Sequence, residues 1–196
     1  MQSMAAIPAV PRAPLGHQPG MRINVRGGGG KTTLARAIAR KHALRFIELD
    51  ATFWLPNWVE SEIADFRRKV QQAADEASEG WVIDGNYAGY LGDLVLKQAD
   101  TIIWLNLPWR VMFWRVLKRS LQRARDKQKI CGDNVESWRV TLSTNSLWWW
   151  YISNRSRLIR RGERFLPLVP EGVPVIEIRT ADELDRFYEL QGLTKD

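Results

Sequence analysis

The sequence predicts an α/β fold in which a parallel sheet is covered by helices on both faces. Short apolar runs alternate with longer segments of helical periodicity, which is the pattern of such sheets. Four consecutive glycines, Gly27 to Gly30, stand between the first apolar run and the first helical segment. Polar residues follow several apolar runs, and ligands of parallel sheets bind beyond the carboxyl ends of the strands. Together these observations predict a three-layer P-loop nucleoside triphosphatase fold.

The elements follow in order from hydrophobic periodicity and turn residues. Apolar runs predict strands at 21–25, 44–49, 81–83, 101–107 and 173–178. Helical spacing predicts a helix that ends at His42, a polar helix at 60–79 and a last helix at 181–190. The segment at about 110–165 is helical, basic and rich in tryptophan, and it is long enough to be an inserted lid over the crevice at the strand ends.

The chain length fits one domain. We expect a single domain at 21–196 that includes the lid, because 196 residues can bury a substantial core. Residues 1–20 are rich in alanine and proline and lack the features of a secretory signal. They are either a disordered extension or a misassigned start, with translation beginning at Met21.

Composition restricts the class of protein. The balance of 45% hydrophobic and 26% charged residues is that of a folded globular protein. A single cysteine, Cys131, excludes an internal disulfide framework and favours a reducing compartment, so we expect a cytoplasmic protein. Lysine and arginine interrupt every apolar run, which argues against integral membrane association.

The positive charge is concentrated in the predicted lid. Residues 110–165 contain 14 lysines and arginines against four acids, a balance of +10, whereas the rest of the chain has 15 basic and 18 acidic residues. Such a local excess indicates an anionic partner for this region, and nucleic acid is one possibility.

The glycine turn predicts a nucleotide site. Only glycines let several backbone N–H groups approach a phosphate chain closely, and the amino end of the following helix adds its dipole. Lys31 would reach the β and γ phosphates of ATP, and the Thr32 hydroxyl would bind Mg²⁺. The cofactor site is therefore expected at Gly27, Gly28, Gly29, Gly30, Lys31, Thr32 and Thr33.

The turn departs from the usual spacing. In G-x-x-x-x-G-K-[ST] a glycine stands six residues before the lysine, but here Val25 occupies that position. Either the loop is two residues shorter and starts at Gly27, or Val25 takes the first glycine's place, where a β-branched residue fits badly at positive φ. The alternative interpretation of the four glycines is a flexible linker that leads into a helix and binds no nucleotide.

Two aspartates are the best candidates for catalysis and metal binding. Asp50 and Asp84 each follow a predicted strand, so both are expected in the crevice, one acting on Mg²⁺ and the other on the phosphoryl acceptor. Asp84 is our candidate for the metal, together with Thr32. The alternative role is helix or turn capping. Asn106 stands at the end of another predicted strand, where an acid would be expected, and an amide cannot act as a base.

A row of arginines could clamp the transferred phosphate. Arg115, Arg119 and Arg123 recur at intervals of four and therefore share a helix face. Guanidinium groups stabilise the charge of a phosphoryl group in transfer. A solvated face or a nucleic-acid contact is the competing interpretation.

The tryptophans exceed what a core of this size needs, although most are expected to be core. Trp54 and Trp58 flank Pro56 after Asp50 and could wall an acceptor pocket. The run 148–151, near several arginines, could instead rest on a membrane surface or stack on bases.

An ordered set of motifs between Met21 and Trp150 resembles the adenylate-kinase-like P-loop proteins called DNA topology modulation proteins. The matching segments are Met21-Arg22-Ile23, Gly30-Lys31-Thr32-Thr33-Leu34-Ala35, Leu49-Asp50-Ala51-Thr52-Phe53-Trp54 with Pro56 and Trp58, Trp81-Val82-Ile83-Asp84-Gly85-Asn86-Tyr87, Asp100-Thr101-Ile102-Ile103-Trp104-Leu105 with Leu107-Pro108, and Gly132-Asp133-Asn134 with Glu136 and Trp138. The family often has Ser-Arg where this chain has Ala88-Gly89, and usually Asp in place of Asn106.

The resemblance implies a small-molecule kinase fold of the nucleoside- and shikimate-kinase type, with ATP on the P-loop, an acceptor near Asp50 and Asp84, and an arginine-bearing lid. Our leading hypothesis is a kinase that transfers the γ-phosphoryl of ATP to a nucleotide or another small acceptor. The alternative is a nucleotide-dependent regulator or DNA-associated protein with little transferase activity.

Overall fold

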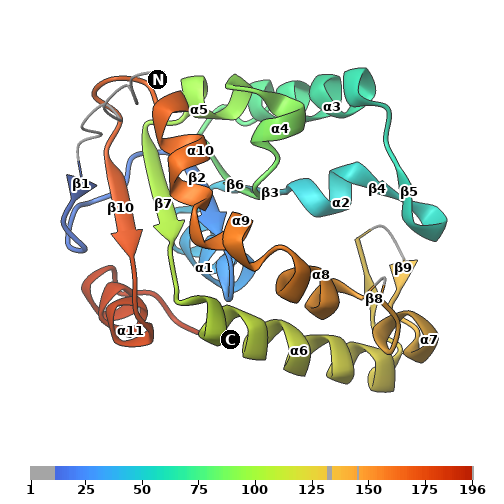
Figure 1. Cartoon of the computed structure of the whole chain (residues 1–196). Helices are drawn as coiled ribbons and strands as arrows, with labels where there is room; N and C mark the ends of the chain where they lie inside the picture. The colour runs from blue at the N-terminus through green and yellow to red at the C-terminus, as the bar shows by residue number, and fades with distance from the viewer. Residues whose placement is uncertain (1–11, 132–133, 145, 196) are drawn as a thin grey trace, which may run out of the picture.

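A six-stranded parallel sheet forms the centre of the molecule. The computed structural model describes residues 12–131, 134–144 and 146–195. In spatial order the strands are β3 (Arg45–Glu48), β6 (Trp81–Asp84), β2 (Arg22–Gly27), β7 (Thr101–Leu105), β10 (Val175–Ile178) and β1 (Arg12–Ala13). β2, which leads into the glycine turn, lies between β6 and β7, as Figure 1 shows. The predicted parallel α/β fold is therefore confirmed.

Helices cover both faces of this sheet and complete the three layers. One core joins Ile23 and Val25 of β2 to α1 (Lys31–His42) and α11 (Ala181–Leu190). The other core joins Ile83 and Trp104 to α3 (Ile63–Asp75), α4 (Ala88–Leu91), α5 (Leu94–Gln98) and α10 (Arg161–Phe165). The two faces of the sheet therefore pack against different helices, because side chains alternate along each strand.

Smaller elements extend the carboxyl end of the sheet. They are α2 (Leu49–Phe53), the hairpin of β4 (Trp54–Leu55) and β5 (Val59–Glu60) with the 3-10 turn η1 (Pro56–Trp58) between them, and the hairpin of β8 (Lys129–Ile130) and β9 (Asn134–Val135). A further 3-10 turn, η2 (Leu166–Leu168), leads from α10 to β10. Asp50, expected at the end of a strand, lies in the first turn of α2 because β3 already ends at Glu48.

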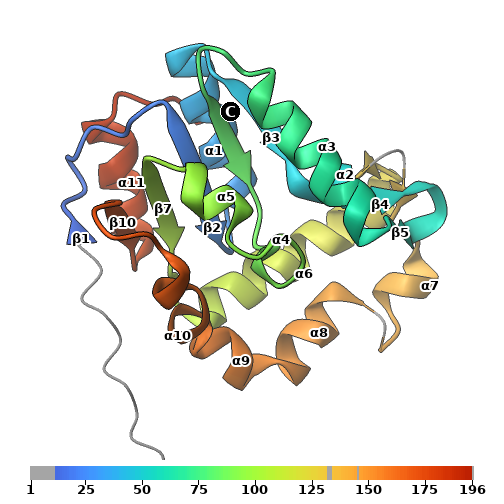
Figure 2. The ribbon, with the colours of Figure 1, turned by 90° about the horizontal axis from the view of Figure 1, so that it is seen from above.

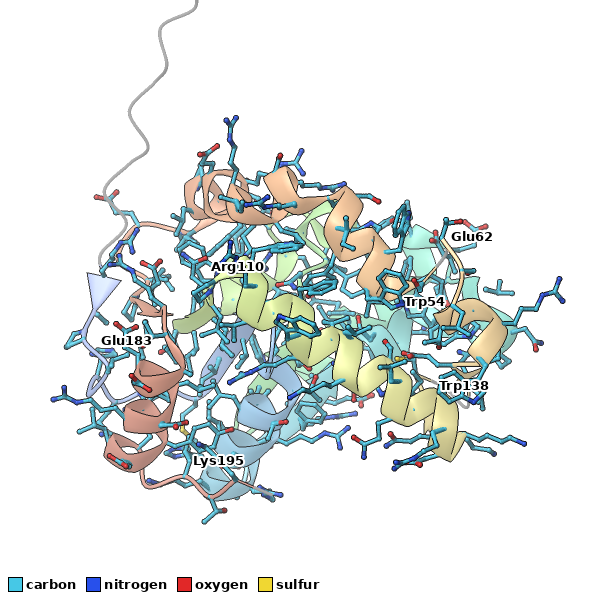
Figure 3. The ribbon with its side chains drawn as sticks, turned by 60° about the horizontal axis from the view of Figure 1, so that its bottom comes forward. Trp54, Glu62, Arg110, Trp138, Glu183 and Lys195 are labelled. Carbon is cyan, nitrogen blue, oxygen red and sulfur yellow. The ribbon has the colours of Figure 1, made fainter. Side chains whose placement is uncertain are left out.

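The region expected as a lid is helical, and it runs across the carboxyl end of the sheet. Its long helix is α6 (Trp109–Asp126), followed by α7 (Trp138–Thr141), α8 (Leu147–Ser153), α9 (Arg155–Ile159) and α10. α7, α8 and α9 each contact α6, and the view from above shows this row bending back toward the sheet (Figure 2). Figure 3 shows side chains in the space between these elements. Arg110 marks the beginning of α6, and Trp138 lies beside the opposite end of that helix.

Residues 12–20 belong to the segment expected to be a disordered extension or a misassigned start, and the structure places them against the sheet. β1 pairs with β10 and so covers an edge of the sheet that would otherwise be open. The Gly20 N–H donates to Thr101 Oγ1 at 2.9 Å, and the Gln191 side chain donates to the carbonyls of Leu15 and His17. Residues 1–11 lie outside the described part of the chain.

Candidate active site

The glycine turn is shorter than the usual P-loop because β2 continues to Gly27. Val25 is fully buried within β2, where it pairs with Asp84 of β6 and Ile103 of β7. It therefore does not take the place of a loop glycine. The turn proper consists of Gly28 to Gly30, with φ of 75° at Gly29 and 131° at Gly30, angles that a side chain would disfavour.

Asn86 fixes the beginning of this turn from a neighbouring strand. Its Oδ1 accepts from the Gly27 N–H at 2.8 Å, and its Nδ2 donates to the Gly27 carbonyl at 2.7 Å. Asn86 can reach Gly27 because the chain turns at Gly85, directly after β6. No local signal in the sequence identifies this role for Asn86, because the pairing of β2 with β6 is the feature that brings the two residues together.

Asp84, Lys31 and Thr32 form one buried polar cluster beneath the turn. Asp84 is 1% exposed, and its two carboxylate oxygens accept from Lys31 Nζ at 2.7 Å and from Thr32 Oγ1 at 2.6 Å. Residues predicted from separate motifs therefore meet at the amino end of α1. The helix has no side-chain cap at Gly30, so its first N–H groups are not satisfied by a capping side chain.

The surrounding carboxylates hold a positive charge on Lys31. Burial opposes the charge, but Asp84 and then Asp50 outweigh it, and the pKa of Lys31 is raised above its usual 10.5. A protonated lysine beside a helix amino terminus attracts anions.

Asp50, the other predicted aspartate, has a different partner from Asp84. Its Oδ1 accepts from the Tyr87 hydroxyl at 2.7 Å. Burial, and then the charge of Asp50, raise the pKa of Tyr87 far above its usual value, so the phenol remains a hydrogen-bond donor. The two predicted aspartates thus occupy distinct positions, Asp84 under the turn and Asp50 away from it.

A single cavity of about 930 Å³ connects these groups. Its lining includes the whole turn from Gly27 to Thr33, then Asp50, and a stretch at 86–90. Among the described residues, the one carboxylate on the lining is that of Asp50. The arginines on the lining are Arg26, Arg115, Arg119, Arg157, Arg161 and Arg164. The volume is at the upper end of the roughly 300–1,000 Å³ typical of small-molecule sites. Its charge suits a polyanion.

The arginine row of α6 divides between two environments. Arg115 and Arg119 line the cavity, and Arg115 Nη1 donates to the Gly29 carbonyl of the turn. Arg123 lies outside the lining and instead pairs with Glu136 at 3.3 Å. Arg115 and Arg119 therefore remain candidates to bind the transferred phosphate, and Arg123 does not.

The tryptophans expected to wall an acceptor pocket lie elsewhere. Trp54 and Trp58 contact one another with ring centroids 5.7 Å apart, and neither lines the cavity. Their hairpin instead meets Asn134, whose side chain bonds to the backbone of Leu55 and Trp58. The cavity uses other aromatic residues, namely Tyr87, Tyr90, Trp104, Trp150, Tyr151 and Phe165.

Thr32 and Asp84 could hold a Mg²⁺ ion together, Thr32 from the cavity lining and Asp84 through its hydrogen bond with Thr32. Both supply oxygen, the donor that Mg²⁺ requires, and their oxygens lie 2.6 Å apart at the turn. Among the described residues, no three histidine, cysteine, aspartate or glutamate side chains gather into a metal-binding group. A Mg²⁺ ion here would therefore take most of its other ligands from phosphate and water.

Comparison with known proteins identifies distant similarity. No family model matches the chain. An uncharacterized protein of Bacillus subtilis (strain 168), YqaC, is 24% identical over 121 residues, which are 62% of this chain and 67% of that protein. A shikimate kinase from Bacteroides thetaiotaomicron is similar in structure, with a TM-score of 0.48 and 20% identity over 88% of this chain and 99% of that one. Within the described ranges, no helix is both long and apolar enough to cross a membrane.

Proposed function

We propose that this protein is an ATP-dependent phosphotransferase that acts on a small acceptor. One observation carries the proposal: the glycine turn and the Asp50–Tyr87 pair line the same cavity. A phosphate-binding turn alone would suit any nucleotide-binding protein. A large cavity that continues from the turn to a second polar pair has room for an acceptor beside the triphosphate.

Each residue has a role in this proposal. The amino end of α1 and Lys31 would bind the β and γ phosphates of ATP. Thr32 and Asp84 would hold Mg²⁺, which when bound neutralises charge on the phosphates. Arg115 and Arg119 would contact the γ-phosphoryl group from α6, because both line the cavity beside the turn.

The transfer itself requires one bond to form and one to break. A hydroxyl oxygen of the acceptor bonds to the γ phosphorus as the bond from that phosphorus to the β,γ-bridging oxygen breaks. ADP leaves with the electron pair, and the hydroxyl proton passes to the carboxylate of Asp50. Catalysis then depends mainly on positioning and charge, as is general for phosphoryl transfer.

Part of the positive charge of the 110–165 region is placed for a small anionic ligand. Five of its fourteen lysines and arginines line the cavity beside the turn. Nucleic-acid binding needs an exposed basic surface and would weaken steeply with salt. A gel-shift titration at low and moderate salt tests that alternative, and a salt-sensitive shift would support it.

The proposal is tested with Lys31→Ala and with the matched surface variant Lys97→Ala, whose lysine pairs only with Asp93 among the described residues. We expect Lys31→Ala to lower ATP turnover about 10²-fold or more, as for removal of a charge-stabilising donor. The assay is ADP release with ATP, Mg²⁺ and a panel of acceptors. Equal ATP affinity and turnover in both variants would refute the role of the turn.

A flat panel has a definite meaning. If the wild-type protein binds ATP in calorimetry but no acceptor accelerates ADP release, the phosphotransferase proposal fails. A nucleotide-dependent regulator is then the better description.

A further inference from the structure

Arg26 is an arginine in the interior of a parallel sheet. It is the penultimate residue of β2, it is 6% exposed, and it pairs in register with Trp104 of β7. Interior strands of parallel sheets are normally apolar on both faces. A charge at this position therefore requires a partner.

The described residues provide Arg26 with little compensation. Its Nη1 donates to Asn24 Oδ1 at 3.2 Å, and its guanidinium lies 4.9 Å from the centre of the Phe165 ring. Its Nε has no hydrogen-bond partner. No carboxylate among the described residues pairs with it, and burial lowers its pKa to about 10. Buried arginines without an anion are rare.

Two more buried donors without acceptors belong to residues that line the same cavity as Arg26. Trp104 Nε1 and Arg161 Nε each have no partner. The Arg161 guanidinium of α10 lies at the end of β7, where its Nη2 donates to the carbonyls of Leu105 and Leu107 and to Asn106 Oδ1. Its Nη1 donates to the Leu158 carbonyl, which leaves Nε as the unmatched donor. Phe165, which the Arg26 guanidinium contacts, is one helical turn after Arg161. Arg26, Trp104 and Arg161 all line the cavity.

All three unmatched atoms are donors, which identifies the missing partner as an acceptor of hydrogen bonds. Two of the three donors belong to cations, so the partner is an anion. The position also separates it from the triphosphate of ATP. Val25 packs in the core with α1, and Arg26 projects from the opposite face of β2, beneath α10.

We propose that Arg26, Trp104 and Arg161, here called the α10 subsite, bind an oxyanion of the acceptor. The acceptor would thus be a small molecule that carries a carboxylate or a phosphate ester besides its hydroxyl group. This inference rests on the proposed phosphotransferase function and names the class of its acceptor. The three residues position the acceptor, and phosphoryl transfer occurs at the turn.

The test measures a second anion site while the turn is occupied. The protein is saturated with ADP and Mg²⁺, and inorganic phosphate or malonate is titrated at constant ionic strength while thermal unfolding is followed. We expect at least one anion to raise the melting temperature of the wild-type complex. The two anions distinguish a phosphate ester from a carboxylate as the group that is bound.

Variants connect the anion to the α10 subsite. Arg26→Met should lower the affinity for the anion at least tenfold, and Arg26→Lys should restore part of that affinity. Trp104→Phe removes the unpartnered N–H together with part of the buried ring, and it should weaken anion binding severalfold. The matched control is Arg155→Met, because Arg155 also lies over an aromatic ring, Trp109 at 5.3 Å, but does not line the cavity.

The outcomes separate the two proposals. If ADP and Mg²⁺ do not bind, the phosphotransferase proposal fails, and this inference fails with it. If ADP binds but neither anion stabilises the complex, or the Arg26 variants respond like the wild type and Arg155→Met, the α10 subsite is refuted while the proposed function stands.

Discussion

Asp84→Asn tests whether the buried cluster under the glycine turn is an ion pair that stabilises the fold. The substitution preserves the size of the side chain but removes its charge. Lys31 Nζ, 2.7 Å from Asp84 Oδ1, would then lose its nearest counter-charge. The Lys31 side chain is only 14% exposed, so water replaces little of what is lost. Breaking a buried ion pair by removing one partner costs about 3–5 kcal/mol.

We expect a loss near the lower end, about 3 kcal/mol, because the charge of Asp50 also acts on Lys31 and remains. For a chain of 196 residues, each kcal/mol shifts the melting temperature by about 2–4 °C, so Tm should fall by about 6–12 °C. The measurement is unfolding by urea and by heat, followed by circular dichroism.

The pH dependence and a double variant complete this prediction. The folded pKa of Lys31 is raised, so the stabilisation by the pair is fully present below the unfolded pKa of 10.5 and is lost only as the pH rises through the folded value. The stability difference should therefore not decline on the alkaline side up to about pH 9. The double variant Lys31→Met/Asp84→Asn should lose about 2 kcal/mol less stability than the sum of the losses of the two single variants. Additive losses, or a cost below about 1 kcal/mol for Asp84→Asn, would refute the ion-pair argument.

Three further substitutions probe the site. Arg26→Met should raise the free energy of unfolding, measured in urea, by about 1–3 kcal/mol. Burial disfavours the charge and lowers the Arg26 pKa from 12.5 to about 10, whereas loss of the contact with Phe165 offsets part of the gain. A destabilised variant would contradict this. Thr32→Val should make nucleotide affinity, measured by calorimetry, nearly independent of Mg²⁺, and an unchanged Mg²⁺ response would exclude Thr32 as a ligand. Asn86→Ala should cost about 1–3 kcal/mol and weaken ADP binding, because both hydrogen bonds to Gly27 disappear; wild-type affinity would show that the turn holds its shape unaided.

The parts of the site that the sequence predicted are those encoded locally. Lys31 and Thr32 follow the glycines directly, and Asp84 ends a short apolar run, so each could be placed from its neighbours alone. Parallel pairing of β2 with β6 then brings Val25 beside Asp84 and aligns the two strand ends. The last helix was predicted with the same limits, 181–190, that it has in the structure, because helical spacing is a local signal.

The features that the sequence did not predict depend on contacts between distant segments. Asn86 and Gly27 are 59 positions apart, and only the sheet brings them into contact. Arg123 shares a helix face with Arg119 but pairs with Glu136, because α6 extends beyond the cavity and its far end meets other elements. Arg26 stood between an apolar run and the glycines, and nothing local distinguished a buried arginine from a solvated one.

The short turn and the arginine-rich cavity have related consequences for phosphate binding. Because β2 continues to Gly27, the N–H of Gly27 donates to Asn86 and that of Gly28 to the Leu105 carbonyl at 3.3 Å. These two donors are then not available to a ligand, whereas a longer loop could direct more of its backbone at the phosphates. Arg115 and Arg119 line the same cavity, and guanidinium groups bind phosphate through charge-assisted hydrogen bonds that are roughly twice as strong as neutral ones. Phosphate recognition in this chain should therefore depend more on α6 and less on the turn than in a P-loop of ordinary length.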